Sequence, residues 1–333
     1  MVNQEEHTLI HKITNLYTQI SSLKTLKPSK DVDTLFTNLV LTCIPTISID
    51  VKNLPINLQS MRANLIKLCG EAEGHLEVHF SNILSSYEHP LDHLNLFPYY
   101  SNYLKLSHLE FSILSHHFPH HVPNKIAFIG SGPLPLTSIV LASKHLPNTS
   151  FHNFDVDSEA NSMAIRLVSP DSDLKNRMFF HSTDVLDVGD EMKEFDVVFL
   201  AALVGMSKEE KVRVIDHLGK FMAPGGILMV RSAHGARAFL YPVVDPCCDL
   251  NGFEVISVFH PTDEVINSII IARKLQSSSG DQQGVLVVPN NNNNNLILPS
   301  CCKCSEIHGF NPLNHGNMVE ELTVEDRDGS MIH

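Results

Sequence analysis

Apolar residues recur at helical spacing in the first third of the chain. The positions Leu9, Ile13, Leu16, Ile20 and Leu23 follow one another at steps of four and three, which places them on one helix face. A second helix is predicted over residues 58–84. Its inward-facing residues are expected to be Met61, Leu65, Leu68, Ala72, Leu76 and Ile83.

A third helix is predicted to begin after Leu106. Ser107 and Glu110 have capping-box spacing, and Leu106 with Phe111 would form a hydrophobic staple. The aromatic segment 95–103, interrupted by a proline, is expected to be an ordered loop. Residues 1–120 are therefore predicted to form an N-terminal helical domain.

From residue 125 onward, short apolar runs alternate with helical stretches, which indicates an α/β domain over residues 121–274. Five runs have the composition of buried parallel strands: 125–132, 150–157, 178–184, 195–202 and 225–232. Two further runs, 253–260 and 268–274, are separated by too short a gap for a helix and suit an antiparallel hairpin. Five parallel strands plus a closing hairpin predict the Rossmann-like fold of S-adenosylmethionine-dependent methyltransferases, within residues 125–274.

Residues 275–333 change in composition and include a run of asparagines from 290 to 295 and an acidic end. Such a segment is typical of a disordered, low-complexity tail. Cys301, Cys302 and Cys304 with His308 offer metal ligands as an alternative, but the Cys-Cys-x-Cys spacing is not that of a standard zinc site.

Charge and composition exclude several classes of partner. The net charge of -13 leaves no basic face for nucleic acid, and no apolar run reaches the roughly 20 residues that span a bilayer. The first residues lack the features of a secretory signal, and the seven cysteines do not form a disulfide framework, so a cytoplasmic protein is expected.

The 20 histidines are an unusual feature of the composition, but their placement does not indicate a metal site. His116, His117, His120 and His121 cluster at a predicted helix end, where positive charge interacts well with the helix C-terminus. We therefore predict no metal ligands in the site.

The segment Gly130, Ser131, Gly132 and Pro133 follows the first strand and precedes a predicted helix. Glycines allow close approach of the backbone to a ligand, and the helix N-terminus supplies free N–H donors. The dinucleotide fingerprint would place a third glycine at 135, where the chain has Pro135. The loop therefore favours the methionine end of S-adenosylmethionine, with a plain tight turn as the alternative.

Acidic residues follow the second and third strands. A carboxylate at Asp155 can accept both hydroxyls of a ribose, with Asp157 as the alternative. Thr183 and Asp184 end the third strand, where an adenine amine can be bound. The competing interpretation is that these acids only cap loops.

The fourth strand ends in residues suited to an apolar wall for adenine, namely Leu200, Ala201 and Val204. Amino-methylating enzymes often carry Asn-Pro-Pro-Tyr there, whereas residues 201–206 offer no group that positions an amine. The reacting groups are therefore expected elsewhere in the chain.

Several segments closely resemble plant nicotianamine synthases over about residues 1–275. They include LCGEAEGHLEVHFS, HPLDHLNLFPYYSNYLKLSHLE, KIAFIGSGPLPLTSIVLA, FDVDSEAN, FDVVFLAALVGM, APGGILMVRSAHGARAFLYPVVDP and HPTDEVINSIIIARK. The resemblance implies condensation of three S-adenosylmethionine molecules by aminocarboxypropyl transfer, with release of methylthioadenosine and closure of an azetidine ring. The product nicotianamine is a metal chelator, which implies a role in iron, zinc and copper homeostasis. It also implies no cofactor beyond S-adenosylmethionine as substrate.

Glu77 is the predicted base for the attacking amine. Glu73 and Glu77 border the apolar stripe of their helix, where a half-buried carboxyl should have a raised pKa. The resemblance implies a catalytic Glu on this helix paired with a tyrosine, which Tyr103 matches best, with Tyr99 and Tyr100 left open. The alternative is that both glutamates are solvated flanking residues.

Substrate contacts are predicted for Glu73, Phe97, Tyr99, Tyr100, Arg231 and His234. Arg231 could bind a carboxylate through two hydrogen bonds, although a structural ion pair is an equally simple interpretation. Packing between domains is the alternative for the aromatic segment.

The competing functions are an ordinary S-adenosylmethionine-dependent methyltransferase and a histidine-rich metal-storage or scaffold protein. The segment Tyr103–Leu106 has the form of a sorting signal, which leaves peripheral association with vesicles open. A homo-oligomer is also left open.

Overall fold

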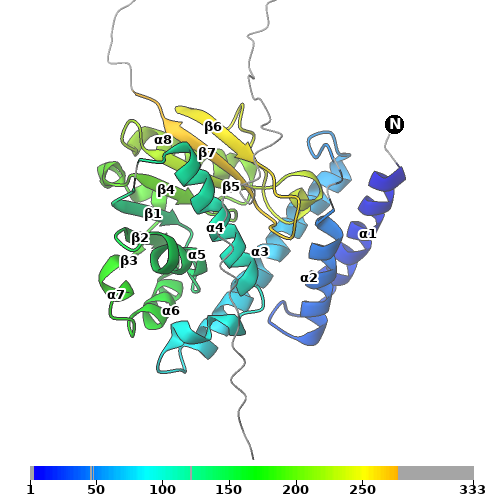
Figure 1. Cartoon of the computed structure of the whole chain (residues 1–333). Helices are drawn as coiled ribbons and strands as arrows, with labels where there is room; N and C mark the ends of the chain where they lie inside the picture. The colour runs from blue at the N-terminus through cyan, green and yellow to red at the C-terminus, as the bar shows by residue number, and fades with distance from the viewer. Residues whose placement is uncertain (1–3, 46, 48, 121, 277–333) are drawn as a thin grey trace, which may run out of the picture.

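The computed structural model describes residues 4–45, 47, 49–120 and 122–276 (Figure 1). The predicted tail therefore lies outside the described residues except for Leu275 and Gln276. The alternative metal ligands Cys301, Cys302, Cys304 and His308 lie outside them as well, as does His121.

A single mixed sheet forms the centre of the molecule, with strand order β3-β2-β1-β4-β5-β7-β6. The strands are β1 (Lys125–Ile129), β2 (Ser150–Asp155), β3 (Met178–Ser182), β4 (Val197–Leu200), β5 (Ile227–Ser232), β6 (Phe253–Phe259) and β7 (Ser268–Lys274). The first five pair in parallel, and β7 pairs antiparallel with both β5 and β6. The insertion of β7 between β5 and β6 distinguishes the sheet from the dinucleotide-binding order 3-2-1-4-5-6. The predicted Rossmann-like methyltransferase fold is confirmed.

Alternate residues of the strands enter two different cores, as the period of two requires. On β1, Ile126 and Phe128 belong to a core shared with the helices α4 (Tyr100–His117) and α5 (Leu136–Val140). Ala127 and Ile129 face the opposite side, where α8 (Lys208–Phe221) covers the sheet. Apolar cores therefore cover both faces of the sheet, which leaves the ends of the strands for a ligand.

The remaining short elements connect these layers. They are η1 (Pro90–Leu96), η2 (Leu141–His145), α6 (Ser158–Val168), α7 (Leu174–Arg177), η3 (Val185–Asp187), η4 (Asp190–Glu194) and η5 (Gly235–Phe239).

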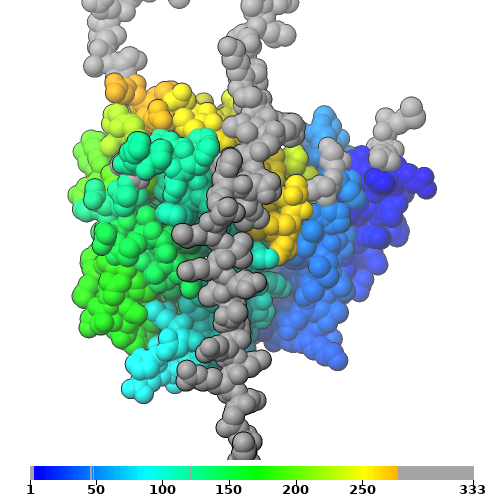
Figure 2. All heavy atoms as spheres, viewed as in Figure 1, coloured from blue at the N-terminus to red at the C-terminus, as the bar shows by residue number. Residues whose placement is uncertain are grey.

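The N-terminal helices α1 (Gln4–Ser21), α2 (Lys30–Cys43) and α3 (Ile56–Leu84) form a third core with η5. The predicted first two helices are confirmed, but α2 was not predicted. Ser29 caps α2 by accepting a hydrogen bond from the Val32 N–H. In Figure 2, α1 and α2 (blue) lie on the opposite side of the molecule from the β2–β3 edge (green).

The prediction of a loop over 95–103 followed by a helix starting after Leu106 is wrong. Helix α4 begins at Tyr100, immediately after Pro98 and Tyr99, and η1 ends at Leu96. Ser107 lies buried inside α4, and Glu110 turns toward β5 instead of back to a helix start. The capping-box spacing does not form a cap here, because the Glu110 carboxylate makes a buried ion pair with Arg231.

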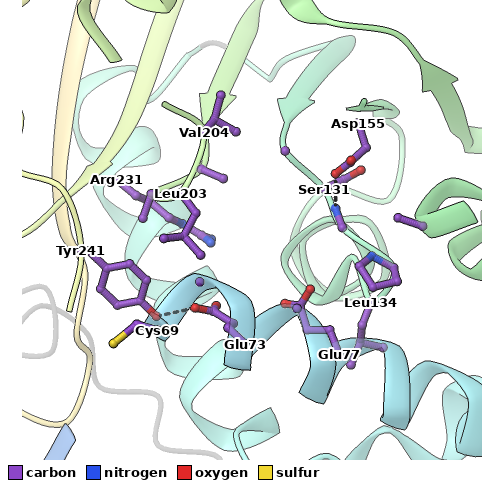
Figure 3. A pocket seen from close by; sticks show the side chains of 18 of the residues that line it. Cys69, Glu73, Glu77, Ser131, Leu134, Asp155, Leu203, Val204, Arg231 and Tyr241 are labelled. Carbon is purple, nitrogen blue, oxygen red and sulfur yellow. Dashed lines mark hydrogen bonds between the residues drawn. The ribbon is translucent and has the colours of Figure 1, made fainter. Parts of the chain in front are cut away.

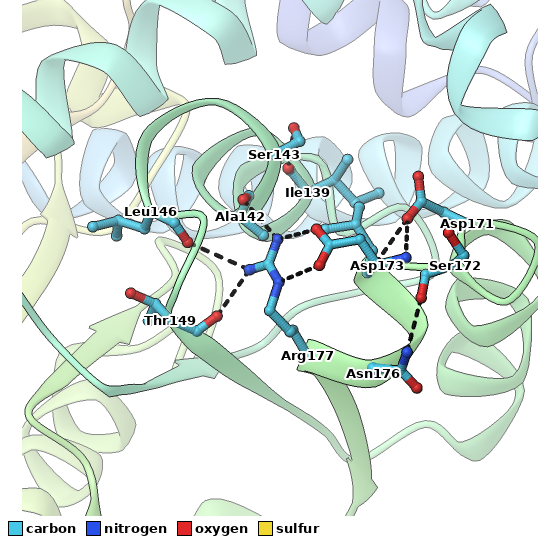
Figure 4. Close-up of polar contacts among 11 residues, drawn as sticks. Ile139, Ala142, Ser143, Leu146, Thr149, Asp171, Ser172, Asp173, Asn176 and Arg177 are labelled. Carbon is cyan, nitrogen blue, oxygen red and sulfur yellow. Dashed lines mark hydrogen bonds and ion pairs between the residues drawn. The ribbon is translucent and has the colours of Figure 1, made fainter.

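Arg177 fixes the turn between η2 and β2. Its guanidinium donates to the backbone oxygens of Ala142, Leu146 and Thr149 at 3.1, 3.4 and 2.9 Å, and it also pairs with Asp173 (Figure 4). Satisfying these carbonyls holds the helix that follows the β1 loop against the sheet edge. None of the helices in the described part of the chain is long and apolar enough to cross a bilayer.

Candidate active site

A cavity of about 870 Å³ lies between α3 and the carboxyl ends of β1, β2 and β4. Its lining comes from both parts of the chain: the α3 segment 69–78 on one side, and the loops after the parallel strands on the other (Figure 3). The carboxyl ends of parallel strands at the point where the strand order reverses are the usual ligand site of such sheets.

The loop after β1 packs closely against neighbouring side chains at Gly130 and Gly132. Both residues have positive φ, at 80° and 66°. A Cβ at Gly130 would lie 2.2 Å from the Val204 side chain, and one at Gly132 would lie 2.7 Å from Oε2 of Glu77. Both positions favour glycine, because other residues rarely adopt a positive φ and because a Cβ would displace the neighbouring side chain.

Asp155, at the end of β2, is tied to this loop. Its Oδ2 accepts the Gly132 N–H at 2.8 Å, and its Oδ1 accepts the Asp157 N–H at 3.0 Å. The carboxylate therefore faces the cavity with a fixed orientation and retains lone pairs for a ligand.

The other two predicted acids line the same cavity but already cap helical turns. Asp157 accepts the Glu159 N–H at 2.8 Å, and Asp184 accepts the Leu186 N–H at 2.9 Å. Thr183 also lines the cavity.

The β4 end supplies the expected apolar wall in part. Ala201 and Val204 line the cavity, whereas Leu200 is buried in the core beneath α8. Lys211, which the sequence did not single out, donates from its Nζ to the backbone oxygens of Ala201 and Ala202, at 2.9 Å each. Burial of this amine lowers its pKa to about 7.

Glu77 and Tyr103 meet at the centre of the cavity. The Tyr103 hydroxyl, from α4, donates to Oε1 of Glu77, from α3, at 3.4 Å. The other carboxylate oxygen lies against the Gly132 backbone. The structure thus places the predicted base beside the predicted methionine-binding loop.

Glu73 lies one helical turn before Glu77 and has a tyrosine of its own. The Tyr241 hydroxyl, which follows η5, donates to Oε2 of Glu73 at 3.0 Å. Tyr241 was missed by the sequence analysis because its segment carries no periodic pattern that would place it near α3.

Burial controls the electrostatics of this cluster. Surrounding protein raises the pKa of Glu77 well above its usual value, and the negative charges of Glu73 and Asp155 raise it further. Burial likewise raises the pKa of Glu73, while the Tyr241 hydrogen bond opposes the change. The pKa values of Tyr103 and Tyr241 are also raised, first by burial and then by the neighbouring carboxylates. The cavity therefore favours a cationic ligand.

Arg231 lines the cavity and also makes the ion pair that was its alternative interpretation. Its Nε and Nη2 donate to the two carboxylate oxygens of Glu110 at 2.7 and 2.9 Å, and Nη2 also donates to Oγ1 of Thr137 at 2.7 Å. This buried pair joins α4 to β5 across the cavity wall. The sequence analysis did not single out Thr137, and it assigned Glu110 only to a capping box.

Of the aromatic residues, Phe97 and Tyr99 line the cavity. Tyr100 packs against the core instead, and His234 stacks on His260 with ring centroids 4.0 Å apart, so neither reaches the cavity lining. Asn102 and Asn267 line it without having been predicted.

In the part of the chain that the structure describes, no group of three or more His, Cys, Asp or Glu residues is arranged to hold a metal ion. The paired rings of His152 and His181, 3.1 Å apart between their nitrogens, pack against Phe154 and do not line the cavity.

Comparison with known proteins gives one family. The nicotianamine synthase protein family matches residues 2–279. A nicotianamine synthase from Solanum lycopersicum is 59% identical over 326 residues, which cover 98% of this chain and 100% of that protein. A probable nicotianamine synthase 4 from Arabidopsis thaliana is 64% identical over 273 residues, covering 81% of this chain and 84% of the relative.

A solved structure shares the fold. MtNAS in complex with MTA and tNA superposes with a TM-score of 0.67, covering 83% of this chain and 100% of MtNAS, at 19% identity. At that identity the likeness concerns the fold alone. The sequence identity to the plant proteins is much higher, since more than half of the aligned positions are identical. The alignment includes the α3 helix, the β1 loop and the hairpin. The chain belongs to the nicotianamine synthase family.

Proposed function

We propose that the protein condenses three molecules of S-adenosylmethionine into nicotianamine, releasing methylthioadenosine at each aminocarboxypropyl transfer. The observation that carries this proposal is the position of Glu77, whose carboxylate lies against the Gly132 backbone and accepts from Tyr103. A base at this place can take the proton of an amine that attacks the donor held by the β1 loop.

Each transfer follows one sequence of bonds. The amine nitrogen forms a bond to the γ-carbon of the donor, and the bond from that carbon to sulfur breaks. Sulfur keeps the electron pair and leaves as neutral methylthioadenosine, while the amine proton passes to Glu77. Tyr103 orients the carboxylate through its hydroxyl. The sulfonium is already a good leaving group, so the protein has mainly to position and deprotonate the amine.

The loops at the carboxyl ends of the strands supply the proposed contacts to the donor. The backbone of Gly130, Ser131, Gly132 and Pro133 holds the methionine end, and Asp155 accepts the ribose hydroxyls. Thr183 and Asp184 meet the adenine amine, and Ala201 with Val204 walls the ring. The acidic cavity favours the cationic donor, because the carboxyl groups of Glu73, Glu77 and Asp155 line it. The positive charge of Arg231 does not oppose this preference, because Glu110 neutralises it.

We further propose that S-adenosylmethionine serves as substrate without a resident cofactor or metal, and that the protein works in the cytoplasm. In this role it would supply a chelator for iron, zinc and copper.

The by-product distinguishes this function from methyl transfer. Purified protein incubated with S-adenosylmethionine alone should release methylthioadenosine, measured by mass spectrometry. Release of S-adenosylhomocysteine in its place would make the protein a methyltransferase. Stoichiometric metal binding with no turnover would make it a metal-storage protein.

A further inference from the structure

Lys211 of α8 is a buried lysine that the proposed transfer does not use. Its side chain is 1% exposed, and no charged group of the described chain offsets the cost of its burial. Lysine is almost never fully buried without a charged partner, because its ammonium loses its hydration there. An apolar side chain of similar length would fill the same space without that cost. The lysine at this position therefore calls for a reason other than packing.

The Lys211 amine points at the backbone of the loop that follows β4. Its Nζ donates to the carbonyl oxygens of Ala201 and Ala202 at 2.9 Å each. The Ala201 oxygen also accepts the Val204 N–H at 3.4 Å, which closes the loop on itself. Buried carbonyl groups are rarely left without a hydrogen-bond donor. Lys211 supplies that donor to two neighbouring carbonyls at once.

The backbone of Lys211 contacts the same loop at its other end. Gly205 has a φ of 70°, and a Cβ on it would lie 2.6 Å from the Lys211 nitrogen and 2.8 Å from the Lys211 Cα. A side chain at position 205 would therefore push the loop away from the first turn of α8. Residues 201–205 thus contact Lys211 twice, through its side chain at the start of the loop and through its backbone at the end.

The residues between these two contacts form part of the cavity wall. The Val204 side chain occupies the space beside Gly130, since a Cβ on that glycine would lie 2.2 Å from it. The Leu203 side chain lies over α3, where a Cβ on Gly70 would still have 3.5 Å of room (Figure 3). The loop is therefore packed tightly on the donor loop and more loosely on α3. A displaced loop should disturb the donor site before it disturbs the helix that carries Glu77.

We propose that Lys211 is a positioning residue for the donor. By holding residues 201–205 against α8, it fixes Ala201 and Val204 where they contact the adenine ring. Lys211 does not itself line the cavity, so it acts only through this loop. The inference rests on the proposed function, which places adenine against this wall. It assigns to Lys211 an effect on donor affinity and none on the base, because Glu77 belongs to another element.

Lys211→Met removes the amine and keeps a side chain of similar length. The Kd for methylthioadenosine and the KM for S-adenosylmethionine should each rise roughly tenfold, as for loss of a hydrogen bond to a charged group, while kcat changes less than twofold. Calorimetric titration and a rate assay measure these quantities. A merely structural lysine would lower the Tm and leave the Kd of the folded variant unchanged. Lys220→Met, at an exposed position of the same helix, is the matched control.

Gly205→Ala tests the second contact and leaves the amine in place. Its methyl group would meet the Lys211 backbone, so the loop should move and the Kd for methylthioadenosine should again rise. Gly225→Ala is the matched control, because Gly225 also has a positive φ, at 85°, but nothing lies within 4 Å of its Cβ. Gly225 precedes β5 and lies outside the cavity lining. Gly205→Ala empties no buried space, so it keeps the proposal testable if Lys211→Met fails to fold.

The double variant shows whether the two changes release the same loop. Its Kd for methylthioadenosine should stay close to that of the weaker-binding single variant, because effects that share one loop are not additive. A Kd raised by the product of the two single effects would mean that they act independently, and would overturn the proposal.

Two further results would also overturn it. An unchanged Kd in the folded single variants would reduce Lys211 to a structural residue, and a lower kcat with Kd retained would place its action on the base. Failure of the wild-type protein to bind methylthioadenosine would instead contradict the donor site of the proposed function.

Discussion

The Glu77 carboxylate packs directly on the backbone of Gly132, so closely that a Cβ on the glycine would lie 2.7 Å from Oε2. One residue belongs to the long N-terminal helix α3 and the other to the loop after the first strand of the sheet. The contact joins the two parts of the chain at the position where the donor and the base must meet. It explains why neither part alone carries a complete site.

Replacing Glu77 by Gln should abolish the base while keeping its shape and its hydrogen bond. We expect turnover to fall by about 10²- to 10⁴-fold, the usual contribution of a general base, with S-adenosylmethionine binding retained. Calorimetric titration and a rate assay measure the two quantities. Glu88→Gln, in the exposed turn that follows the same helix and outside the cavity lining, is the matched control and should keep full activity. Undiminished turnover in Glu77→Gln would exclude this residue as the base.

Tyr103→Phe removes the hydroxyl that orients the base. A hydrogen bond to a charged group contributes about 1.5–3 kcal/mol, so kcat should fall about tenfold to a hundredfold with little change in KM. Tyr100→Phe is the control, because Tyr100 packs against the core beside the same loop without reaching the cavity. If Tyr100→Phe lost activity and Tyr103→Phe kept it, Tyr100 and not Tyr103 would be the catalytic tyrosine.

The raised pKa of Glu77 predicts a stability cost that depends on pH. At low pH the carboxyl is protonated in both the folded and the unfolded chain, and folding costs nothing through this group. As pH rises, the unfolded chain releases its proton first, so stability falls until the folded-state pKa is passed, by about 1.4 kcal/mol per unit of difference.

Glu77→Gln should therefore raise the Tm relative to the wild type at pH 8 and lose this advantage toward pH 4. Thermal unfolding across that range, without ligand, measures the difference. If Glu77→Gln changed the Tm by the same amount at pH 8 and at pH 4, burial would not raise the pKa of the Glu77 carboxyl in the folded protein. In the assay, the wild-type rate should fall as pH drops through the raised pKa, because the base becomes protonated.

Asp155→Ala should weaken donor binding. The change removes the acceptor of the Gly132 N–H and the predicted contact to ribose, so Kd for methylthioadenosine should rise about tenfold or more. Asp157→Ala gives the comparison, since its side chain caps α6. Unaltered affinity in Asp155→Ala with weaker binding in Asp157→Ala would transfer the ribose contact to Asp157.

Much of the sheet could be predicted from the sequence because its strands are buried on both faces. Continuous apolar runs followed by Gly130, Asp155 and Asp184 mark both the strands and their carboxyl ends. Helix α2 was missed although its sequence carries a helical pattern, since apolar residues recur at steps of three and four at Val32, Leu35, Phe36, Leu39, Val40 and Cys43. The start of α4 was misplaced because local capping spacing competes with a long-range use of Glu110.

The site was only partly predictable for a related reason. Glu77 and the β1 loop have local signals, helical spacing and paired glycines. Tyr241 and Asn267 reach the cavity through the packing of η5 and the register of β7 on β5, which connect residues far apart in the chain. No local pattern marks such residues.

The most direct test of the proposed condensation is to trace the aminocarboxypropyl carbons of S-adenosylmethionine into the products. S-adenosylmethionine labelled with ¹³C in its aminocarboxypropyl group is supplied as the sole substrate, and the products are quantified by mass spectrometry. We predict three molecules of methylthioadenosine for each nicotianamine, with all label in nicotianamine. Label in S-adenosylhomocysteine, with an unlabelled methylated product, would contradict the account.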